Sequence, residues 1–412
     1  MSSAATSAEN PPSSRAPVPL AQDARVIALV GLAHAASHFG HLLLAVMFPV
    51  FMSEFGLSFA QLGLLTSVFF VVSGVGQACA GFVVDRFGAR PLLFAALALF
   101  ALASVSASLV TGYSGLVATA AIAGLANATF HPVDFTILNQ RVSSPRLGYA
   151  FSAHGLTGNL GWAAAPVFLT GMAALTNWRT AYVAAAVMYA LILVLLAVCR
   201  ADLHTRVVVH AAGAQGAPGA LGFLRLPVVW WCFGFFMLST MTLAVVQNFS
   251  VSILRAQYGV SLEAATFTLS AYMLSGAVGM FVGGVVAART QRSDQVVAAA
   301  MLTGAVLLGL CGLGWLGANA TMAVLALTGF AIGIGGPSRD MMIKRATPVG
   351  ATGRVYGMVY SGLDVGFAIA PVVFGVWMDK GLYGATLLGA ALVLLLSVGA
   401  AVAVGARTPA RA

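Results

Sequence analysis

Long apolar runs follow one another along almost the whole chain, separated by short turns that contain charged residues, glycine or proline. Each run is close to the length, about 20 residues, that an α-helix needs to cross a bilayer. Helices are expected because they satisfy their backbone hydrogen bonds internally, as lipid requires. The pattern predicts twelve transmembrane helices, over residues 25–52, 58–84, 90–110, 114–140, 147–173, 178–199, 226–253, 262–288, 295–316, 319–344, 354–378 and 383–405.

Composition excludes a soluble protein. The 412 residues are 60% hydrophobic and only 8% charged, whereas a soluble domain has about 25% charged residues. Most of the 20 lysines and arginines fall in loops on one side of the predicted helices. The positive-inside rule therefore places both termini in the cytoplasm. The net charge of +9 reflects this topology, so no nucleic-acid partner is expected.

The two halves of the sequence repeat each other in the same order. Residues 71–90 resemble residues 273–292, and residues 120–140 resemble residues 325–345. Internal repeats of this kind indicate two copies of one structural unit. The predicted organisation is a disordered cytoplasmic tail at 1–24, a six-helix half at 25–199, a cytoplasmic linker at 200–225, a second six-helix half at 226–405 and a short cytoplasmic tail at 406–412.

The loop sequence "GFVVDRFGARP" at 81–91 resembles the signature of the major facilitator superfamily between its second and third helices. The resemblance implies an all-α membrane protein of twelve transmembrane helices in two parallel, pseudo-symmetric six-helix halves. It also implies a conformational latch at the matching positions, where a carboxylate can pair with a nearby guanidinium. Those positions are Gly81, Asp85, Arg86, Gly88 and Arg90.

A second resemblance is narrower. The segment "FHPVD" at 130–134, together with a first helix that carries several histidines, is similar to the fosmidomycin-resistance branch of drug exporters. The fifth helix partly resembles the glycine and proline motif of drug/proton antiporters. These similarities imply a multi-pass transporter of a bacterial inner membrane that works by alternating access.

Three histidines interrupt the first apolar helix. His34, His38 and His41 fall within an arc of about 60° on a helix. Three imidazoles at this spacing could hold zinc, but residues 29–51 contain no Asp, Glu or Cys, so we expect no metal. A proton-accessible face that lines the substrate cavity is favoured. Core histidines bonded to neighbouring helices are the alternative.

The fourth helix carries the densest group of polar residues. Asn127, His131 and Asp134 share one face, and Pro132 is expected to kink the helix beside them. A charged group inside the bilayer is expensive and therefore indicates function. The sequence predicts that Asp134 carries a proton with His131 as its relay. A fixed hydrogen-bonded knot that holds the kink is the alternative.

Aligning the repeats places Arg339 opposite Asp134, so the two are expected to face one cavity and to pair. Asp340 and Asp364 are rival partners of Arg339, and the guanidinium could instead bind an anionic substrate. His154, on the fifth helix, is equally consistent with a backbone hydrogen bond and with a role in the site. The predicted substrate and proton cavity comprises His34, His38, His41, Asn127, His131, Asp134, Thr240, Gln247, Arg339 and Asp364.

Taken with the resemblance, these residues predict proton-coupled export of a small organic compound. Proton-driven uptake of an organic acid is the alternative within transport, and a non-transporting receptor on the same fold is the alternative of another class. An ATP-driven pump is not expected, since the sequence has no Gly-x-x-x-x-Gly-Lys nucleotide-binding loop. We expect no cofactor and no enzyme activity, because the Ser, His and Asp residues are scattered over the helices and form no catalytic constellation. The expected partners are the substrate, protons and the lipid bilayer, and the chain is expected to be monomeric.

Overall fold

The computed structural model describes residues 19–205, 222–290, 292–346 and 352–407, and regular structure within these ranges is helical throughout. The predicted tails at 1–18 and 408–412 and most of the linker, 206–221, lie outside the described residues. The first half of the chain contains α1 (Leu20–His41), η1 (Ala45–Met47), α2 (Phe48–Phe55), α3 (Phe59–Phe87), α4 (Ala89–Leu109), α5 (Tyr113–Asn127), α6 (Phe130–Arg141), η2 (Ser144–Arg146), α7 (Leu147–Leu175) and α8 (Trp178–Val198).

The second half contains η3 (Gly222–Arg225), α9 (Pro227–Tyr258), α10 (Leu262–Arg289), α11 (Ser293–Gly312), α12 (Ala318–Ala346), α13 (Thr352–Asp379) and α14 (Tyr383–Arg407). Within the described residues, 11 helical segments are long and apolar enough to cross a membrane. Helix α7, which is 29 residues long and carries polar residues in its first half, is the twelfth. The prediction of twelve transmembrane helices is confirmed, with α1 to α2 forming the first and α5 with α6 the fourth.

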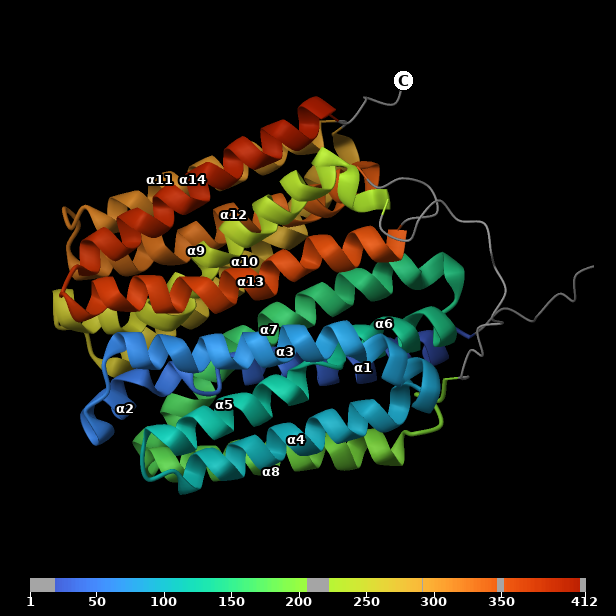
Figure 1. Ribbon diagram of the computed structural model, residues 1–412, viewed down its shortest axis with the longest axis horizontal. Helices are drawn as coiled ribbons and strands as arrows, with labels where there is room; N and C mark the ends of the chain where they lie inside the picture. Colours follow the sequence, from blue (N-terminus) through green and yellow to red (C-terminus); the bar gives the residue numbers. More distant parts are fainter. Residues whose placement is uncertain (1–18, 206–221, 291, 347–351, 408–412) are drawn as a thin grey trace, which may run out of the picture.

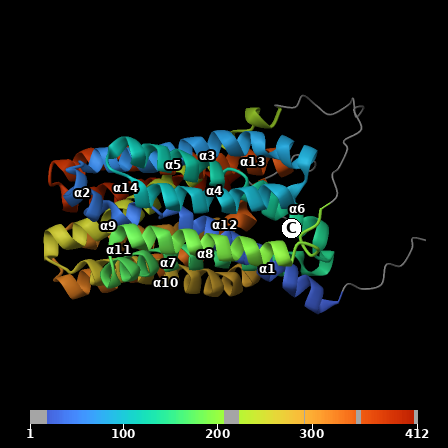
Figure 2. The ribbon, with the colours of Figure 1, turned by 90° about the horizontal axis from the view of Figure 1, so that it is seen from below.

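The helices form two bundles that lie side by side (Figure 1), one built from α1 to α8 and the other from α9 to α14. The described ends of the chain lie at the same end of the molecule in both views (Figures 1 and 2). We call the opposite end, where α3 begins and α13 ends, the distal end. The bundles meet mainly through two helix pairs, α3 with α13 and α7 with α10. The repeat relates these pairs to each other, as expected for two pseudo-symmetric halves.

The distal end is held together by hydrogen bonds between the halves. The amides of Phe59 and Ala60, at the start of α3, donate to the carboxylate of Asp379 at 2.5 and 3.0 Å. The Thr66 hydroxyl donates to the side-chain oxygen of Asn248, on α9, at 2.5 Å. The halves are therefore in direct polar contact at this end.

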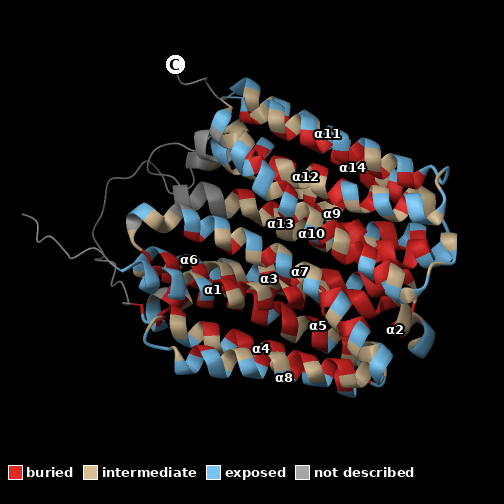
Figure 3. Ribbon diagram, turned by 180° about the vertical axis from the view of Figure 1, so that it is seen from behind, coloured by how far each residue is buried: buried red, intermediate tan, exposed pale blue. Residues whose placement is uncertain are grey.

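Burial follows the pattern expected of a protein surrounded by lipid. Buried residues line the inner faces of the helices, while exposed residues follow their outer faces (Figure 3). Many of the exposed side chains are large and apolar, including Leu175, Phe281 and Trp315. Such extensive exposed apolar surface would be abnormal in water, and here it is the surface that contacts lipid.

Two local features differ from the sequence prediction. Helix α1 begins at Leu20, so residues 20–24 of the predicted tail are helical. Asp23 anchors this extra turn, because its buried carboxylate accepts from the Ser143 amide at 3.2 Å and from Arg146 at 2.7 Å. The fourth span is divided at Ala128 and Thr129 rather than kinked in mid-helix. Pro132 then lies in the first turn of α6, where a missing backbone donor is tolerated.

Candidate functional site

Asp134 lies at the centre of a buried polar cluster in the first half of the chain. It is fully buried, and its Oδ2 atom is 3.1 Å from His34 Nδ1 and 3.1 Å from His154 Nε2. Its other oxygen, Oδ1, is buried without a hydrogen-bond partner. The cluster thus joins three helices, α6 through the carboxylate, α1 through His34 and α7 through His154.

His154, whose role the sequence does not decide, belongs to this cluster. Its ring stacks on that of His34, with 3.4 Å between the ring centroids. The imidazole of His38 lies beside His34 at 4.4 Å between centroids and contacts Trp162 on its other side. His38 Nδ1 is buried and has no hydrogen-bond partner. His34 and His38 therefore face α7 of their own bundle, whereas the ring centroid of His41 also lies 6.4 Å from that of Phe367, on α13 of the second half.

Asn127 organises a second group, about two helical turns nearer the distal end. Its side-chain oxygen accepts from the Ser37 hydroxyl at 2.7 Å and from His41 Nε2 at 3.0 Å. Its amide nitrogen donates to Ser73 at 2.9 Å. The other ring nitrogen of His41 accepts from Trp162 Nε1 at 3.3 Å. Both nitrogens of His41 are therefore in use, which distinguishes this histidine from His38.

A chain of hydrogen bonds leads from the cluster to the other half of the molecule. His131 Nδ1 is 3.0 Å from the side-chain oxygen of Gln77, on α3. The Gln77 amide nitrogen donates to Asp364 Oδ2, on α13, at 3.4 Å. Asp364 also packs closely on α3, because a Cβ at Gly74 would lie 3.3 Å from its own Cβ. The sequence does not indicate Gln77 as a site residue. A single amide among small residues on a helix indicates a function only when its hydrogen-bond partners are known.

Arg339 does not pair with Asp134. Among the ion pairs of the described residues, its guanidinium is bonded to Asp340, with 3.0 Å from Nε to Oδ1. The Cζ atom lies over the ring of Phe236, 4.9 Å from its centroid. Asp134 is hydrogen-bonded to two histidines of its own half. The acidic group of the first half and the basic group of the second therefore each have a partner within their own half.

The two remaining predicted cavity residues lie on one helix but contact different neighbours. Thr240 and Gln247 are buried on α9. The amide of Gln247 is 3.9 Å from the sulfur of Met273 on α10, and Thr240 packs against Gly366 on α13, where an added Cβ would lie 3.0 Å from its own. Neither is joined to the histidine cluster by a hydrogen bond that the described residues reveal.

The predicted latch lies at the end of the molecule that holds the chain termini. Gly88 ends α3 with φ of 81°, a conformation that suits glycine. Arg90 donates to the carbonyl of Arg200 at 3.1 Å, and Arg86 is exposed over Phe87. The side chain of Asp85 and the surroundings of Gly81 lie outside the described residues. The latch therefore stays a prediction.

The fold and the buried polar groups define a class of protein, a polytopic membrane transporter built from two related halves. The sequence pattern of the Major Facilitator Superfamily matches residues 30–371 and residues 246–412. The chain belongs to the Major Facilitator Superfamily. It is a multi-pass membrane transporter of a small substrate and not an enzyme.

Three curated relatives are similar in sequence. The probable sulfoacetate transporter of Cupriavidus necator is 23% identical over 86% of this chain and 87% of its own length. The fosmidomycin resistance protein of Escherichia coli is 25% identical over 34% of this chain and 35% of its own length. The probable L-galactonate transporter of Escherichia coli is 25% identical over 32% of this chain and 29% of its own length.

Solved structures agree on the fold. The crystal structure of a bacterial homolog of the human lysosomal transporter Spinster, in an inward-facing and occupied conformation, superposes with a TM-score of 0.77 at 13% identity. It covers 95% of this chain and 98% of that one. The inward-facing, unoccupied form gives a TM-score of 0.70 at 14% identity, over 94% and 96% of the two chains.

Proposed function

We propose that this chain exports a small organic compound across a bacterial inner membrane in exchange for protons, with both termini in the cytoplasm. The placement of the basic residues supports this orientation. The two related halves, joined by the pairs α3–α13 and α7–α10, support transport by alternating access, in which one half rocks against the other around a central site. The remaining question is which group couples the proton to that movement.

Coupling requires a group whose surroundings change when the halves move. Asp134 fits this requirement poorly, because both of its hydrogen-bond partners, His34 and His154, belong to its own half. Asp364 fits it well. It lies on α13 and contacts α3 of the other half through Gln77 and Gly74. This contact between the halves is the observation that carries the proposal. It supports Asp364 as the proton carrier we propose, in place of the Asp134 predicted from sequence.

The substrate is expected to be an organic anion with an apolar or polarisable part. Arg339 offers a guanidinium beside the ring of Phe236, and its bond to Asp340 is an interaction that a substrate carboxylate or sulfonate can replace. Two relatives carry the names of organic anions, sulfoacetate and L-galactonate. Fosmidomycin is the third compound to test. Thr240 and Gln247 would contribute polar contacts if the substrate reaches α9.

Transport into proteoliposomes tests the proposal. The purified chain is reconstituted, a pH gradient of either sign is imposed, and uptake of labelled sulfoacetate, L-galactonate and fosmidomycin is measured. Export by antiport predicts accumulation inside vesicles whose lumen is acidic, whereas proton symport predicts accumulation when the outside is acidic. Movement of none of the three under either gradient, in protein that is folded, would favour the receptor alternative.

Variants then separate the two carboxylates. Asp364→Asn should abolish accumulation driven by the pH gradient while substrate exchange at equal pH persists. Asp202→Asn is the matched control, because Asp202 follows α8 and pairs with Arg25 of its own half, at 3.0 Å. If Asp134→Asn uncouples transport and Asp364→Asn does not, the assignment to Asp364 is wrong and the prediction from sequence stands.

A further inference from the structure

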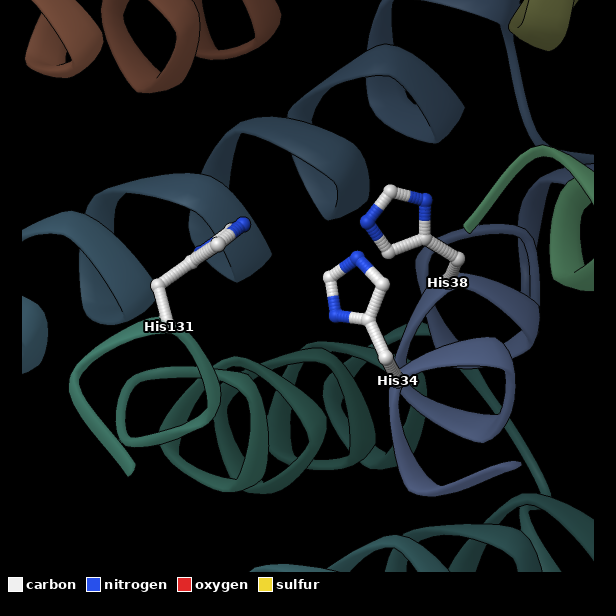
Figure 4. A group of neighbouring side chains, drawn as sticks. All are labelled: His34, His38 and His131. Carbon is white, nitrogen blue, oxygen red and sulfur yellow. The ribbon is translucent and has the colours of Figure 1, made fainter. Parts of the chain in front are cut away.

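The histidines of the first half also form an arrangement that the proposed function does not use. One ring nitrogen from each of His34, His38 and His131 lies within 4.8 Å of the other two. Figure 4 shows His131 extending from α6 toward the two imidazoles of α1. Three imidazoles that converge from two helices can bind a metal ion, and the question is whether their lone pairs are free to do so.

Two of the three histidines are oriented as metal ligands usually are. A ligating histidine typically donates its other ring N–H to a carboxylate or to an amide or carbonyl oxygen, which fixes the ring. His34 Nδ1 is 3.1 Å from the carboxylate of Asp134, and His131 Nδ1 is 3.0 Å from the side-chain oxygen of Gln77. Both acceptors require the Nδ1 proton, so the Nε2 atom of each ring carries a free lone pair.

The third histidine lacks a partner altogether. His38 Nδ1 is buried without a hydrogen bond, which is an unfavourable state for a ring nitrogen. It lies above Gly158 of α7, where an added Cβ would be 2.7 Å from it and 3.1 Å from His34 Nε2. The missing side chain at Gly158 therefore leaves space directly beside two free nitrogens that belong to different turns of α1.

We propose that His34, His38 and His131 form a binding site for a divalent first-row transition-metal ion such as Zn²⁺. Imidazole nitrogen is a preferred ligand for these ions, and three protein ligands with one open position are a common arrangement. Zinc–nitrogen bonds of about 2.0–2.1 Å place neighbouring nitrogens about 3.4 Å apart. The rings need to close by little more than about 1 Å, and the space beside Gly158 allows it.

The surroundings fit this ion. The carboxyl group of Asp134 lies next to His34, and its Oδ1 atom is buried without a hydrogen-bond partner. His154 stacks on His34 and holds its orientation while donating to the same carboxylate. His34 is buried, whereas His38 and His131 are partly exposed, so the site has a side from which an ion can enter. The inference goes beyond the proposed function and does not depend on it.

The fold supplies to the histidines of α1 the neighbours that their own helix lacks. Residues 29–51 contain no acidic ligand, but the fold brings Asp134, His131 and His154 to the stripe from α6 and α7. His41 is excluded from the site for a structural reason, since Asn127 and Trp162 occupy both of its nitrogens. That difference between neighbouring histidines of the same stripe makes the proposal testable.

The test is metal binding by the purified full-length chain after treatment with a chelator. Co²⁺ is titrated and its visible absorption recorded, and Zn²⁺ stoichiometry is measured by equilibrium dialysis. The expected result is one ion per chain with the intense absorption of a tetrahedral site. His38→Ala, His131→Ala and Gly158→Ala should each abolish the absorption band or weaken binding at least tenfold. Asp134→Asn should weaken it about 10–100-fold.

Two controls define the site. His41→Ala removes a histidine from the same stripe and should leave one ion bound, and His204→Ala tests an exposed histidine beyond α8. Each variant is checked by size-exclusion chromatography, and Zn²⁺ should raise the melting temperature of the native chain but not that of His38→Ala. Absence of saturable binding to the native chain would overturn the proposal. Binding that survives both His38→Ala and Gly158→Ala would overturn it equally.

Discussion

Asp379 ties the two halves together at the distal end, and its removal should change which end of the transporter is open. Its carboxylate accepts from the amides of Phe59 and Ala60, the first residues of α3, at 2.5 and 3.0 Å. These amides have no partner within their own helix, and the positive end of the helix dipole adds to the attraction. The alternating access proposed above would break both hydrogen bonds whenever the distal end opens.

The effect can be estimated from the bonds themselves. A hydrogen bond to a charged group contributes about 1.5–3 kcal/mol when it is shielded from water. Asp379 is exposed, so we take about 1–2 kcal/mol for the two bonds together. Since about 1.4 kcal/mol corresponds to a factor of ten, Asp379→Ala should raise the ratio of distal-open to distal-closed molecules about 5–30-fold.

Spin labels report this ratio directly. Labels on cysteines at Thr111 and Gly317, in the α4–α5 and α11–α12 connections, span the distal end from one half to the other. The four native cysteines are first replaced. Electron–electron distance measurements should show a longer component that grows in Asp379→Ala. Glu54→Ala is the matched control, because Glu54 also lies near this end but pairs at 4.0 Å with Arg179 of its own half. An unchanged distance distribution in Asp379→Ala would refute the reasoning.

Three further predictions follow from single residues. Asp85→Asn should abolish transport without reducing membrane insertion, measured by uptake and by the amount of protein in the membrane. Normal transport by this variant would contradict the predicted latch. Arg339→Lys should weaken binding of an organic anion about tenfold, because a bidentate contact is lost; isothermal titration calorimetry measures it, and unchanged affinity would place the anion elsewhere. Asp23→Ala should lower stability by about 1–3 kcal/mol, because it removes the acceptor of the Ser143 amide and the ion pair with Arg146; a melting temperature equal to that of the native chain would contradict this.

The sequence determines the fold because lipid imposes a simple rule. Helix length and apolarity are local properties, so the twelve spans could be predicted from runs of residues alone. The repeat then limited the architecture to two related halves. Deviations occur where a tertiary contact intervenes. Asp23 extends α1 into the predicted tail because Ser143 and Arg146 lie close to it in space, and no local pattern predicts such a contact.

The candidate site was predictable in its members and less so in its pairing. An ionisable side chain in an apolar helix is easily recognised in a sequence, which is why His34, His38 and Asp134 could be selected. Their partners depend on how helices are rotated about their axes. The sequence indicates His154 as a candidate but not its partner, and it does not indicate Gln77 at all, yet each forms a hydrogen bond to a selected residue. Symmetry of the repeat suggested Arg339 for Asp134, but symmetry relates positions in two halves and does not require that they touch.

Gln77 links the two proposals physically. Its amide oxygen accepts from His131, one of the three proposed metal ligands, and its amide nitrogen donates to Asp364, the proposed proton carrier. His131 and Gln77 belong to the first half, whereas Asp364 belongs to the second. When the halves separate at α3 and α13, the bond from Gln77 to Asp364 must break, while the bond to His131 can persist. The histidine cluster can therefore keep its geometry through the transport cycle, and Asp364 experiences the change of surroundings that coupling requires.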